Sequence, residues 1–202
     1  MNIKTFNLGG TNCYIVWDSQ EAAVIDPADS SILSFINENS LTVKYIILTH
    51  CHFDHIGGVR SVADKTYAKI AIHKNDACGL TDNRFNLGMM LGEDYTQGEP
   101  DILLSDGDIL NIGDTTLKIL HTPGHTPGGI GILANESVLF AGDTLFRRSV
   151  GRSDFPGGNH TVLINSIKTK FMPLSDDTAV YPGHDAPTSI GEERMQNPYI
   201  MP

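Results

Sequence analysis

A nearly continuous apolar run, VKYIILT at residues 43–49, leads directly into the segment HCHFDH at residues 50–55. A run without polar alternation is typical of a strand that is buried on both faces. The loop after such a strand stays open to a ligand while the strand holds its backbone in place. This junction therefore favours a layered fold of helices and strands, with a polar site at the end of a central strand.

The segments on either side of this junction alternate between strand and helix patterns. Residues 12–18 and 22–27 alternate apolar and polar positions around Asp18 and Ser19, which predicts an antiparallel hairpin. Asp29 and Ser30 are suited to cap the helix that follows them. We expect a two-sheet sandwich covered by helices. Its helices are predicted at residues 31–40, 58–65, 160–171 and 189–196, and its further strands at residues 69–73, 108–113, 115–122, 129–135, 137–143 and 178–184.

Length and charge restrict the class of protein. With 202 residues the chain is long enough for one well-buried domain, residues 1–202, with an excursion or lid of irregular pattern at residues 80–100. The net charge of −10 would repel nucleic acid and anionic membrane surfaces, so neither is an expected partner. Residues 1–18 contain no leader pattern, and three cysteines do not suit a disulfide framework, so we expect a cytoplasmic protein.

The segment at residues 50–55 holds four potential metal ligands, His50, His52, Asp54 and His55. A solvated loop has no packing reason to require such a density, so the clustering favours a metal site. One ion could not use all four comfortably, because His50 and His52 project to one side while Asp54 and His55 lie further along the turn. Two neighbouring ions would divide these ligands between them.

Three more candidate ligands, His125, Asp143 and His184, each follow a strand-like run beside glycine or proline turns. If those strands lie in packed sheets, the three side chains converge on the sheet edge that carries the histidine cluster. Imidazole and carboxylate suit zinc, iron or manganese, and the absence of a thiolate-rich set argues against a closed structural zinc site. Taken singly, any of these histidines could equally be a hydrogen-bonded loop residue. Together they predict an open, catalytic metal site.

The spacing His-x-His-x-Asp-His, with the three later ligands, resembles that of the metallo-β-lactamase-fold hydrolases over nearly the whole chain. The motifs TPGHTPGG, AGDTLF, GRSDFPGG and PGHDAPTSIGEE are similar to those of the glyoxalase II-like hydroxyacylglutathione hydrolases and their shorter bacterial relatives. The resemblance implies an α/β fold, a four-layer αββα sandwich, and two divalent metal ions. Zinc is the expected metal, with iron or manganese as alternatives. The resemblance assigns His50, His52 and His125 to one ion, Asp54, His55 and His184 to the other, and Asp143 to both.

This resemblance predicts a hydrolase that cleaves S-acyl-glutathione or a related small-molecule thioester. Two cations about 3.5–4 Å apart could share a water and lower its pKa toward neutrality, and the resulting hydroxide would attack the thioester carbonyl. Asp54 and Asp143 are the predicted catalytic residues, because Asp143 would bridge both ions and Asp54 would orient the nucleophile as well as ligate. Arg152 is the candidate for binding a substrate carboxylate, and a structural ion pair with Asp154 is an equal alternative.

Other functions stay open. The sequence GRSDF at residues 151–155 also resembles the GRTDF element of persulfide dioxygenases, which share the fold but use one iron and dioxygen. That resemblance implies a mononuclear site of His50, His125 and Asp143. A lactonase would use the same hydroxide on another electrophile. A non-catalytic metal-binding or redox-sensing module is the remaining alternative, motivated by the position of Cys51 between two candidate ligands.

The remaining notable residues are assigned to packing and hydrogen bonding. Cys13, Cys51 and Cys78 are expected to be buried as small apolar residues. His73, His121 and His160 lie near the ends of elements, where capping or loop hydrogen bonding is the better interpretation. Six residues of the 80–100 excursion could form an apolar flap over the metals, a dimer contact or a simple core cover: Phe85, Leu87, Met89, Met90, Leu91 and Tyr95.

Overall fold

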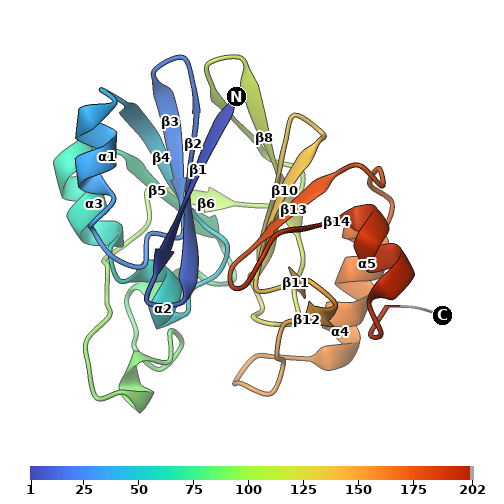
Figure 1. The fold of residues 1–202 in the computed structure, drawn as a ribbon. Helices are drawn as coiled ribbons and strands as arrows, with labels where there is room; N and C mark the ends of the chain where they lie inside the picture. Colours follow the sequence, from blue (N-terminus) through green and yellow to red (C-terminus); the bar gives the residue numbers. More distant parts are fainter. Residues whose placement is uncertain (201–202) are drawn as a thin grey trace.

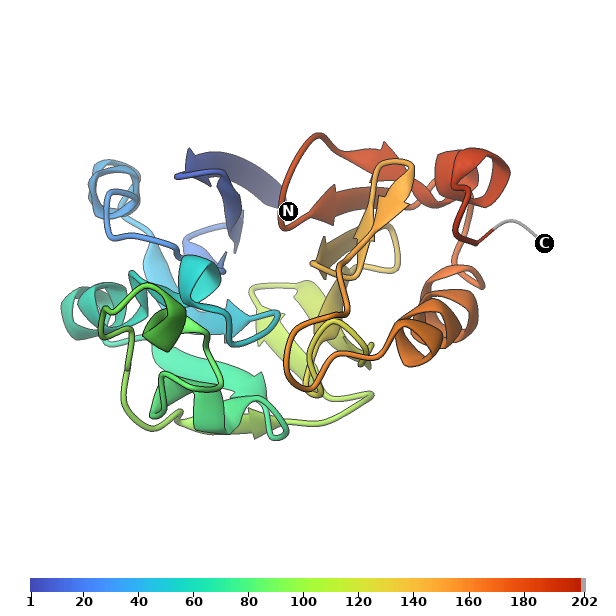
Figure 2. The same cartoon turned by 90° about the horizontal axis from the view of Figure 1, so that it is seen from below.

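The computed structural model, which describes residues 1–200, places two six-stranded sheets face to face with helices on both outer faces (Figure 1). The first sheet comes from the N-terminal half of the chain and the second from the C-terminal half. Seen from below, the sheets and helices form four successive layers (Figure 2). This order of helix, sheet, sheet and helix confirms the αββα architecture expected from the sequence.

The first sheet begins as an antiparallel meander and continues with parallel strands. Ser19 adopts a left-handed conformation, with φ 55°, in the turn that forms the predicted hairpin. Helices α1 (Leu33–Glu38) and α3 (Val59–Thr66) lie in the crossovers that parallel strands require. In sheet order the strands are β1 (Asn2–Leu8), β2 (Thr11–Asp18), β3 (Glu21–Ile25), β4 (Thr42–Leu48), β5 (Lys69–His73) and β6 (Ile102–Leu104).

The second sheet is mainly antiparallel, but β10 and β13 pair in parallel. Its outer face is covered by α4 (His160–Ser166), the π-helical turn η3 (Ile167–Phe171) and α5 (Ile190–Gln196). In sheet order the strands are β14 (Thr188–Ser189), β13 (Ala179–Pro182), β10 (Val138–Gly142), β9 (Ile130–Ala134), β8 (Thr115–His121) and β7 (Ile109–Ile112), and a separate hairpin joins β11 (Leu145–Phe146) to β12 (Ser149–Val150).

Apolar side chains fill all three interfaces between the layers. Strand β4 shows how one segment serves two of them, because Ile46 packs toward the helices and Ile47 packs toward the second sheet. Both side chains are fully buried, and burial of each stabilises the fold by about 1.5–3 kcal/mol. The predicted strand buried on both faces is therefore confirmed, and it anchors the loop that follows.

Three local predictions were incomplete or wrong. Strand β1 was not predicted, because it is an edge strand whose mostly exposed side chains show no clear apolar alternation. Strand β6, also at an edge, has only three residues. Asp29 does not cap α1, which begins at Leu33. Its carboxylate instead accepts hydrogen bonds from the backbone and hydroxyl of Ser31, two residues on, which makes a turn before the helix.

The 80–100 excursion connects β5 to β6 and lies below the first sheet beside α2 (Phe53–Ile56), where it forms the green loop in Figure 1. It is irregular apart from the 3-10 helices η1 (Ala77–Leu80), at its start, and η2 (Gly88–Met90). Within residues 1–200, every helix is too short or too polar to cross a membrane.

Candidate metal centre

The loop after β4 carries four candidate ligands, two on extended backbone and two on a helical turn. His52 is still extended, with ψ 146°, and the short helix α2 begins at the next residue. His50 and His52 therefore come from the extended part of the loop, whereas Asp54 and His55 come from the first helical turn. This change of backbone conformation separates the four side chains into two pairs that face different neighbours.

Three histidines from both halves of the chain form what we call the buried triad: His50, His52 and His125. One ring nitrogen of each lies within 4.8 Å of those of the other two. Nε2 of His125 is 2.9 Å from Nδ1 of His52. All three residues are buried, with exposed fractions of 5% or less. His125 reaches them from the turn between β8 and β9.

A second group, which we call the half-exposed triad, consists of Asp54, His55 and His184. Nε2 of His55 lies 3.3 Å from Nε2 of His184. His55 is fully buried, but the side chains of Asp54 and His184 are 35% and 29% exposed. His184 comes from the loop directly after β13. This triad therefore lies nearer to solvent than the buried triad.

Asp143 lies between the two triads, immediately after β10. Its Oδ2 is 3.6 Å from Nε2 of His125 in the buried triad and 3.4 Å from Nε2 of His184 in the half-exposed triad. Its Oδ1 is 3.4 Å from Nε2 of His55. A Cβ atom on Gly183 would collide with this carboxylate, so only glycine allows β13 to pass so close. All seven side chains predicted as ligands thus meet at one place.

The outer nitrogens of four of these rings are held by the protein. Nδ1 of His50 lies 3.1 Å from Oγ1 of Thr49, and Nδ1 of His55 lies 3.0 Å from Oδ2 of Asp26. Nδ1 of His125 donates to the carbonyl of Arg152 at 2.7 Å, and Nδ1 of His184 donates to that of Gly10 at 2.9 Å. Metal-binding histidines are oriented in this way, because the outer hydrogen bond leaves the inner nitrogen free as a ligand.

Unsatisfied atoms at the centre of the site also suit a cation. Nε2 of His50 and Oδ1 of Asp143 are buried, and neither makes a hydrogen bond within residues 1–200. Burying such atoms unpaired is costly, and a bound ion would satisfy them. Two imidazole nitrogens on one zinc lie about 3.3 Å apart, given Zn–N distances of about 2.0–2.1 Å and tetrahedral geometry. The separations of 2.9 Å and 3.3 Å within the triads are close to that value. The residues therefore fit metal ions chemically and geometrically.

Charge differs between the triads. Burial, and then the neighbouring rings of His55 and His52, lowers the pKa of His50 well below its ordinary value. Burial, and then His125, lowers the pKa of His52 to about 3. These imidazoles are consequently neutral at physiological pH, which is the form that binds a metal. No carboxylate belongs to this triad.

Carboxylates dominate the half-exposed triad. Asp143 and Asp54 together raise the pKa of His184 to about 11. Burial opposes a charge on His55, but Asp143 and Asp26 outweigh it and raise its pKa to about 9. This side of the centre therefore has a strong negative field that attracts cations.

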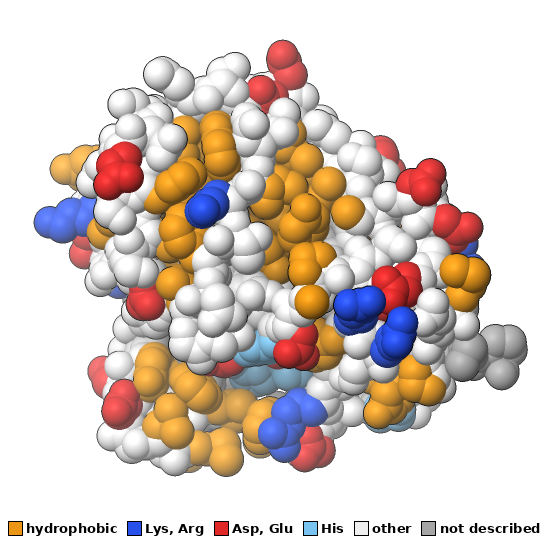
Figure 3. All heavy atoms as spheres, in the orientation of Figure 1, with side chains coloured by type: hydrophobic (Ala, Val, Ile, Leu, Met, Phe, Trp, Pro, Cys, Tyr) orange, Lys and Arg blue, Asp and Glu red, His pale blue; other side chains and the backbone are white. Residues whose placement is uncertain are grey.

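The centre opens into a cavity of about 390 Å³, which we call the main pocket. Figure 3 shows histidine side chains at the floor of this hollow, with hydrophobic side chains gathered beside them. Most of the pocket's own walls are apolar and aromatic. The walls consist of Phe53, Leu87, Phe146 and Phe155, and the rim carries Arg152.

Arg152 makes the ion pair that the sequence left as an alternative. Its Nε and one terminal nitrogen donate to the two carboxylate oxygens of Asp154, each at 2.8 Å, and its guanidinium stacks 3.8 Å from the ring centroid of Phe155. The side chain is nevertheless 56% exposed at the rim of the main pocket. Arg152 can therefore pair with Asp154 in the free protein and also bind a substrate carboxylate, because an exposed ion pair can exchange partners at little cost.

Asp26 is a functional residue that our sequence reasoning missed. It is 1% exposed, it follows β3, and its backbone has φ 50°. Oδ2 accepts a hydrogen bond from the Thr49 hydroxyl at 2.5 Å and contacts His55, while Oδ1 accepts from the Thr49 amide. The Asp26 carboxylate therefore holds Thr49, which precedes the ligand segment, and His55, which ends it. The sequence feature that could have indicated Asp26 is its position directly after the apolar strand AAVI. That strand pairs with β4, which leads into His50.

Other predicted roles have mixed outcomes. Cys13 and Cys51 are buried as expected, but Cys78 is exposed, because η1 turns it toward the surface. His73 accepts a hydrogen bond from the amide of Asn75, as predicted for a loop residue. Its ring also stacks on that of His121, 3.9 Å between centroids, which sequence could not foresee because the two strands belong to different sheets.

The predicted flap residues divide into two sets. Leu87 is buried and lines the main pocket, and the ring of Tyr95 packs against that of Phe53. The exposed set, whose members are more than half exposed, is Phe85, Met89, Met90 and Leu91. The excursion therefore contributes one wall of the main pocket and an exposed apolar edge beside it.

Comparison with known proteins yields one family and many relatives. A family model described as the metallo-beta-lactamase superfamily matches residues 6–184. The hydroxyacylglutathione hydrolase GloC of Haemophilus influenzae is 35% identical over 201 residues, which cover 94% of this chain and 92% of that protein.

Solved structures agree with this result. The chain resembles the BLEG-1 B3 metallo-β-lactamase with a TM-score of 0.94 and 38% identity, over 100% of both chains. It resembles a di-iron-bound form of the protein TTHA1623 with a TM-score of 0.84 and 30% identity, over 98% of this chain and 100% of that one.

Proposed function

Because the chain belongs to the metallo-β-lactamase superfamily of hydrolases, we propose that it is a dinuclear metal-dependent enzyme that cleaves small-molecule thioesters of the glyoxalase II type. The observation that carries this proposal is the position of Asp143, within 3.6 Å of nitrogens of both triads. A carboxylate in that position suits a ligand shared by two ions. A single ion would leave one of the two triads without a function.

In this proposal the buried triad would hold one divalent ion, the half-exposed triad would hold the second, and Asp143 would serve as a ligand to both. Bound zinc ions, or iron or manganese in their place, would lower the pKa of a water and polarise a substrate carbonyl. The chain supplies the orientation, since Thr49, Asp26 and two backbone carbonyls hold the ligand rings from behind. Asp54 is half-exposed toward the main pocket, where its carboxylate can orient the attacking water.

The main pocket supports a small-molecule substrate. Its aromatic walls keep bulk water from the reacting centre, which strengthens electrostatic interactions there. Arg152 at the rim can bind a substrate carboxylate by exchanging it for Asp154. The thioester itself is proposed from the similarity to a hydroxyacylglutathione hydrolase over nearly the whole chain.

One comparison favours a second substrate class. The similarity to BLEG-1 B3 metallo-β-lactamase covers both chains completely. Opening of a β-lactam is also an attack of water on an activated carbonyl, so the same arrangement of residues could serve it. The two substrate classes therefore belong in one assay.

The test is elemental analysis of protein purified without added metal, with three assays on the same sample: S-lactoylglutathione, a chromogenic cephalosporin, and oxygen uptake with glutathione persulfide. We expect close to two metals per chain and turnover of the thioester. Turnover of the cephalosporin alone would move the proposal to a β-lactamase. One iron per chain, with oxygen uptake and no thioester turnover, would replace it with a mononuclear persulfide dioxygenase.

A further inference from the structure

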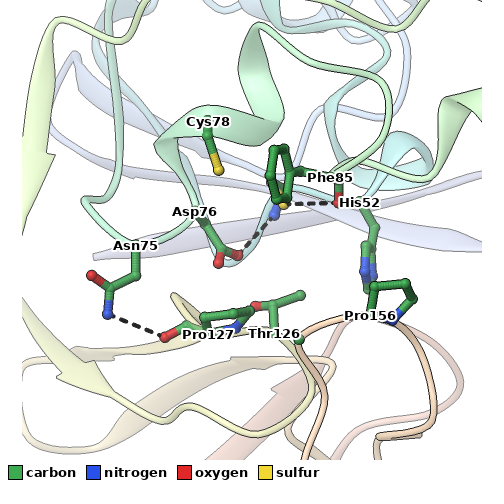
Figure 4. A pocket seen from close by; sticks show the side chains of 10 residues that line it. His52, Asn75, Asp76, Cys78, Phe85, Thr126, Pro127 and Pro156 are labelled. Carbon is green, nitrogen blue, oxygen red and sulfur yellow. Dashed lines mark hydrogen bonds between the residues drawn. The ribbon is translucent and has the colours of Figure 1, made fainter.

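A second, smaller cavity adjoins the candidate metal centre at His52, which lines both this cavity and the main pocket. We call it the side pocket (Figure 4). The segment after β5 forms its upper wall in this view, and two loops of the C-terminal half form its floor and right side. Its lining includes Asp76, Cys78 and Phe85 from the first segment, and Thr126, Pro127 and Pro156 from the loops.

The carboxylate of Asp76 links the loops that form the side pocket. Asp76 is 1% exposed, and its two oxygens accept hydrogen bonds from the backbone amides of Gly128, at 2.5 Å, and Cys51, at 3.2 Å. These bonds join the segment after β5 to the loop of the metal ligands and to the loop that carries His125. The pocket is therefore a built cavity with a fixed shape, rather than a gap between mobile loops.

The polar side chain of Thr126 does not face the cavity. Its hydroxyl is buried beside the Asp76 carboxyl, where a hydrogen bond to that carboxyl opposes the rise that burial causes in the pKa of Asp76. The rings of Phe85, Pro127 and Pro156 otherwise present carbon to the cavity.

The volume of the side pocket restricts what it can hold. It measures about 150 Å³, compared with about 390 Å³ for the main pocket. An apolar cavity of roughly 150 Å³ accepts a molecule the size of benzene. A tripeptide thiol is far too large for that space, whereas a short acyl chain fits. The larger and more open main pocket is left for the thiol portion.

We propose that the side pocket is the acyl subsite of this enzyme, and that it takes short, mainly apolar acyl groups of up to about six carbons. This inference rests on the proposed thioester hydrolysis, which it deepens. The reacting carbonyl lies at the metal centre next to His52, the acyl chain passes into the side pocket, and the thiol portion extends into the main pocket. Chain-length selectivity is then set by the walls of the side pocket.

Cys78 makes the pocket testable, because it is the one exposed cysteine among the three, all of which lie in residues 1–200. We compare the metal-loaded wild type with Cys78→Phe, which fills the cavity, and with the matched control Thr81→Phe, which adds the same ring at an exposed residue that lines neither pocket. The substrates are the acetyl and butyryl thioesters of N-acetylcysteamine. We expect Cys78→Phe to lower kcat/KM for the butyryl thioester by about tenfold or more and for the acetyl thioester by less than about twofold. Thr81→Phe should retain the wild-type preference.

A second measurement does not depend on catalysis or on the folding of a variant. Iodoacetamide alkylates Cys78 of the wild type, and mass spectrometry follows the rate in the presence of butyrate or acetate. The reaction is run at alkaline pH, because burial and the nearby Asp76 raise the pKa of this thiol. Saturating butyrate should slow alkylation several-fold, whereas acetate, which is two carbons shorter, should slow it less.

The outcomes separate the two proposals. If the metal-loaded protein hydrolyses neither these thioesters nor S-lactoylglutathione, the proposed function fails and the acyl subsite fails with it. Hydrolysis of S-lactoylglutathione alone would reject the acyl subsite while the proposed function stands. If both thioesters are hydrolysed but Cys78→Phe changes them equally, or butyrate gives no protection, the subsite is wrong while the proposed function stands. Selective loss of the butyryl activity together with protection by butyrate would support the subsite.

Discussion

The two triads of the candidate metal centre differ in burial and in charge. The buried triad contains three imidazoles and no carboxylate, and the pKa values of His50 and His52 are lowered by burial. The half-exposed triad contains Asp54, and its histidines have raised pKa values because carboxylates surround them. The first is thus a dry and neutral site, whereas the second is negative and closer to solvent.

This difference indicates how the two proposed ions would behave. The three histidines of the buried triad are exposed by 5% or less, so an ion held there should exchange slowly. An ion in the half-exposed triad is attracted more strongly by the carboxylate field but can be reached by a chelator. Asp143 connects the two sites, so it alone should affect both.

The largest effect is expected from Asp143→Ala. This change removes the carboxylate that lies between the triads, so both ions should be lost together and thioester turnover should fall by on the order of 10³-fold. Elemental analysis and the thioester assay on one sample measure this, with Asp177→Ala, an exposed carboxylate that lines neither pocket, as the matched control. Retention of two metals with full activity would contradict both the bridging role and the proposed function.

A pair of ligand substitutions should separate the triads. His184→Ala removes a partly exposed ligand and should leave about one metal per chain, held by the buried triad. His50→Ala removes a ligand at the buried triad and should lower thermal stability as well, because it leaves a cavity beside buried polar atoms. Metal content and melting temperature are measured for both. The comparison between the triads fails if the two variants lose the same metal and the same stability.

A smaller effect is expected from Asp26→Asn, which keeps the size of the side chain but removes its charge. Asp26 contacts Nδ1 of His55 from behind the half-exposed triad. Weakening such an outer contact typically lowers metal affinity by about 10–100-fold. We therefore expect the second ion to be removed at a lower chelator concentration, with the first unchanged. Asp29→Asn, an exposed carboxylate near α1, is the control, and equal behaviour of the two variants would reject a positioning role for Asp26.

The smallest effect is expected from Arg152→Gln. The ion pair with Asp154 is exposed, and solvent screens such pairs, so the melting temperature should hardly change. If Arg152 binds a substrate carboxylate, KM for S-lactoylglutathione should rise several-fold, while KM for a neutral N-acetylcysteamine thioester stays constant. Kinetics with both substrates check this. A KM that changes equally for both would assign Arg152 a structural role only.

Much of the candidate site could be predicted from sequence because its first part is contiguous. In the segment from His50 to His55, the spacing alone predicted that His50 and His52 project to one side and that Asp54 and His55 lie further along the turn, but it did not predict the helix α2 that carries the second pair. The continuous apolar run before it predicted β4, and both faces of that strand are indeed buried. The positions of His125, Asp143 and His184 after strands could also be predicted, because each residue follows a strand-like run in the sequence.

Pairing between distant strands is what only the tertiary structure decided. Parallel pairing aligns Gly142 of β10 with Pro182 of β13, and this register alone brings Asp143 next to Gly183 and His184. Asp26 reaches His55 because β3 lies beside β4, and the side pocket exists because Asp76 joins loops from both halves of the chain. The sequence by itself therefore determined which side chains end strands and what chemistry they carry. Their distances, their burial and their pKa values follow from contacts between segments far apart in the chain, which local backbone preferences do not specify.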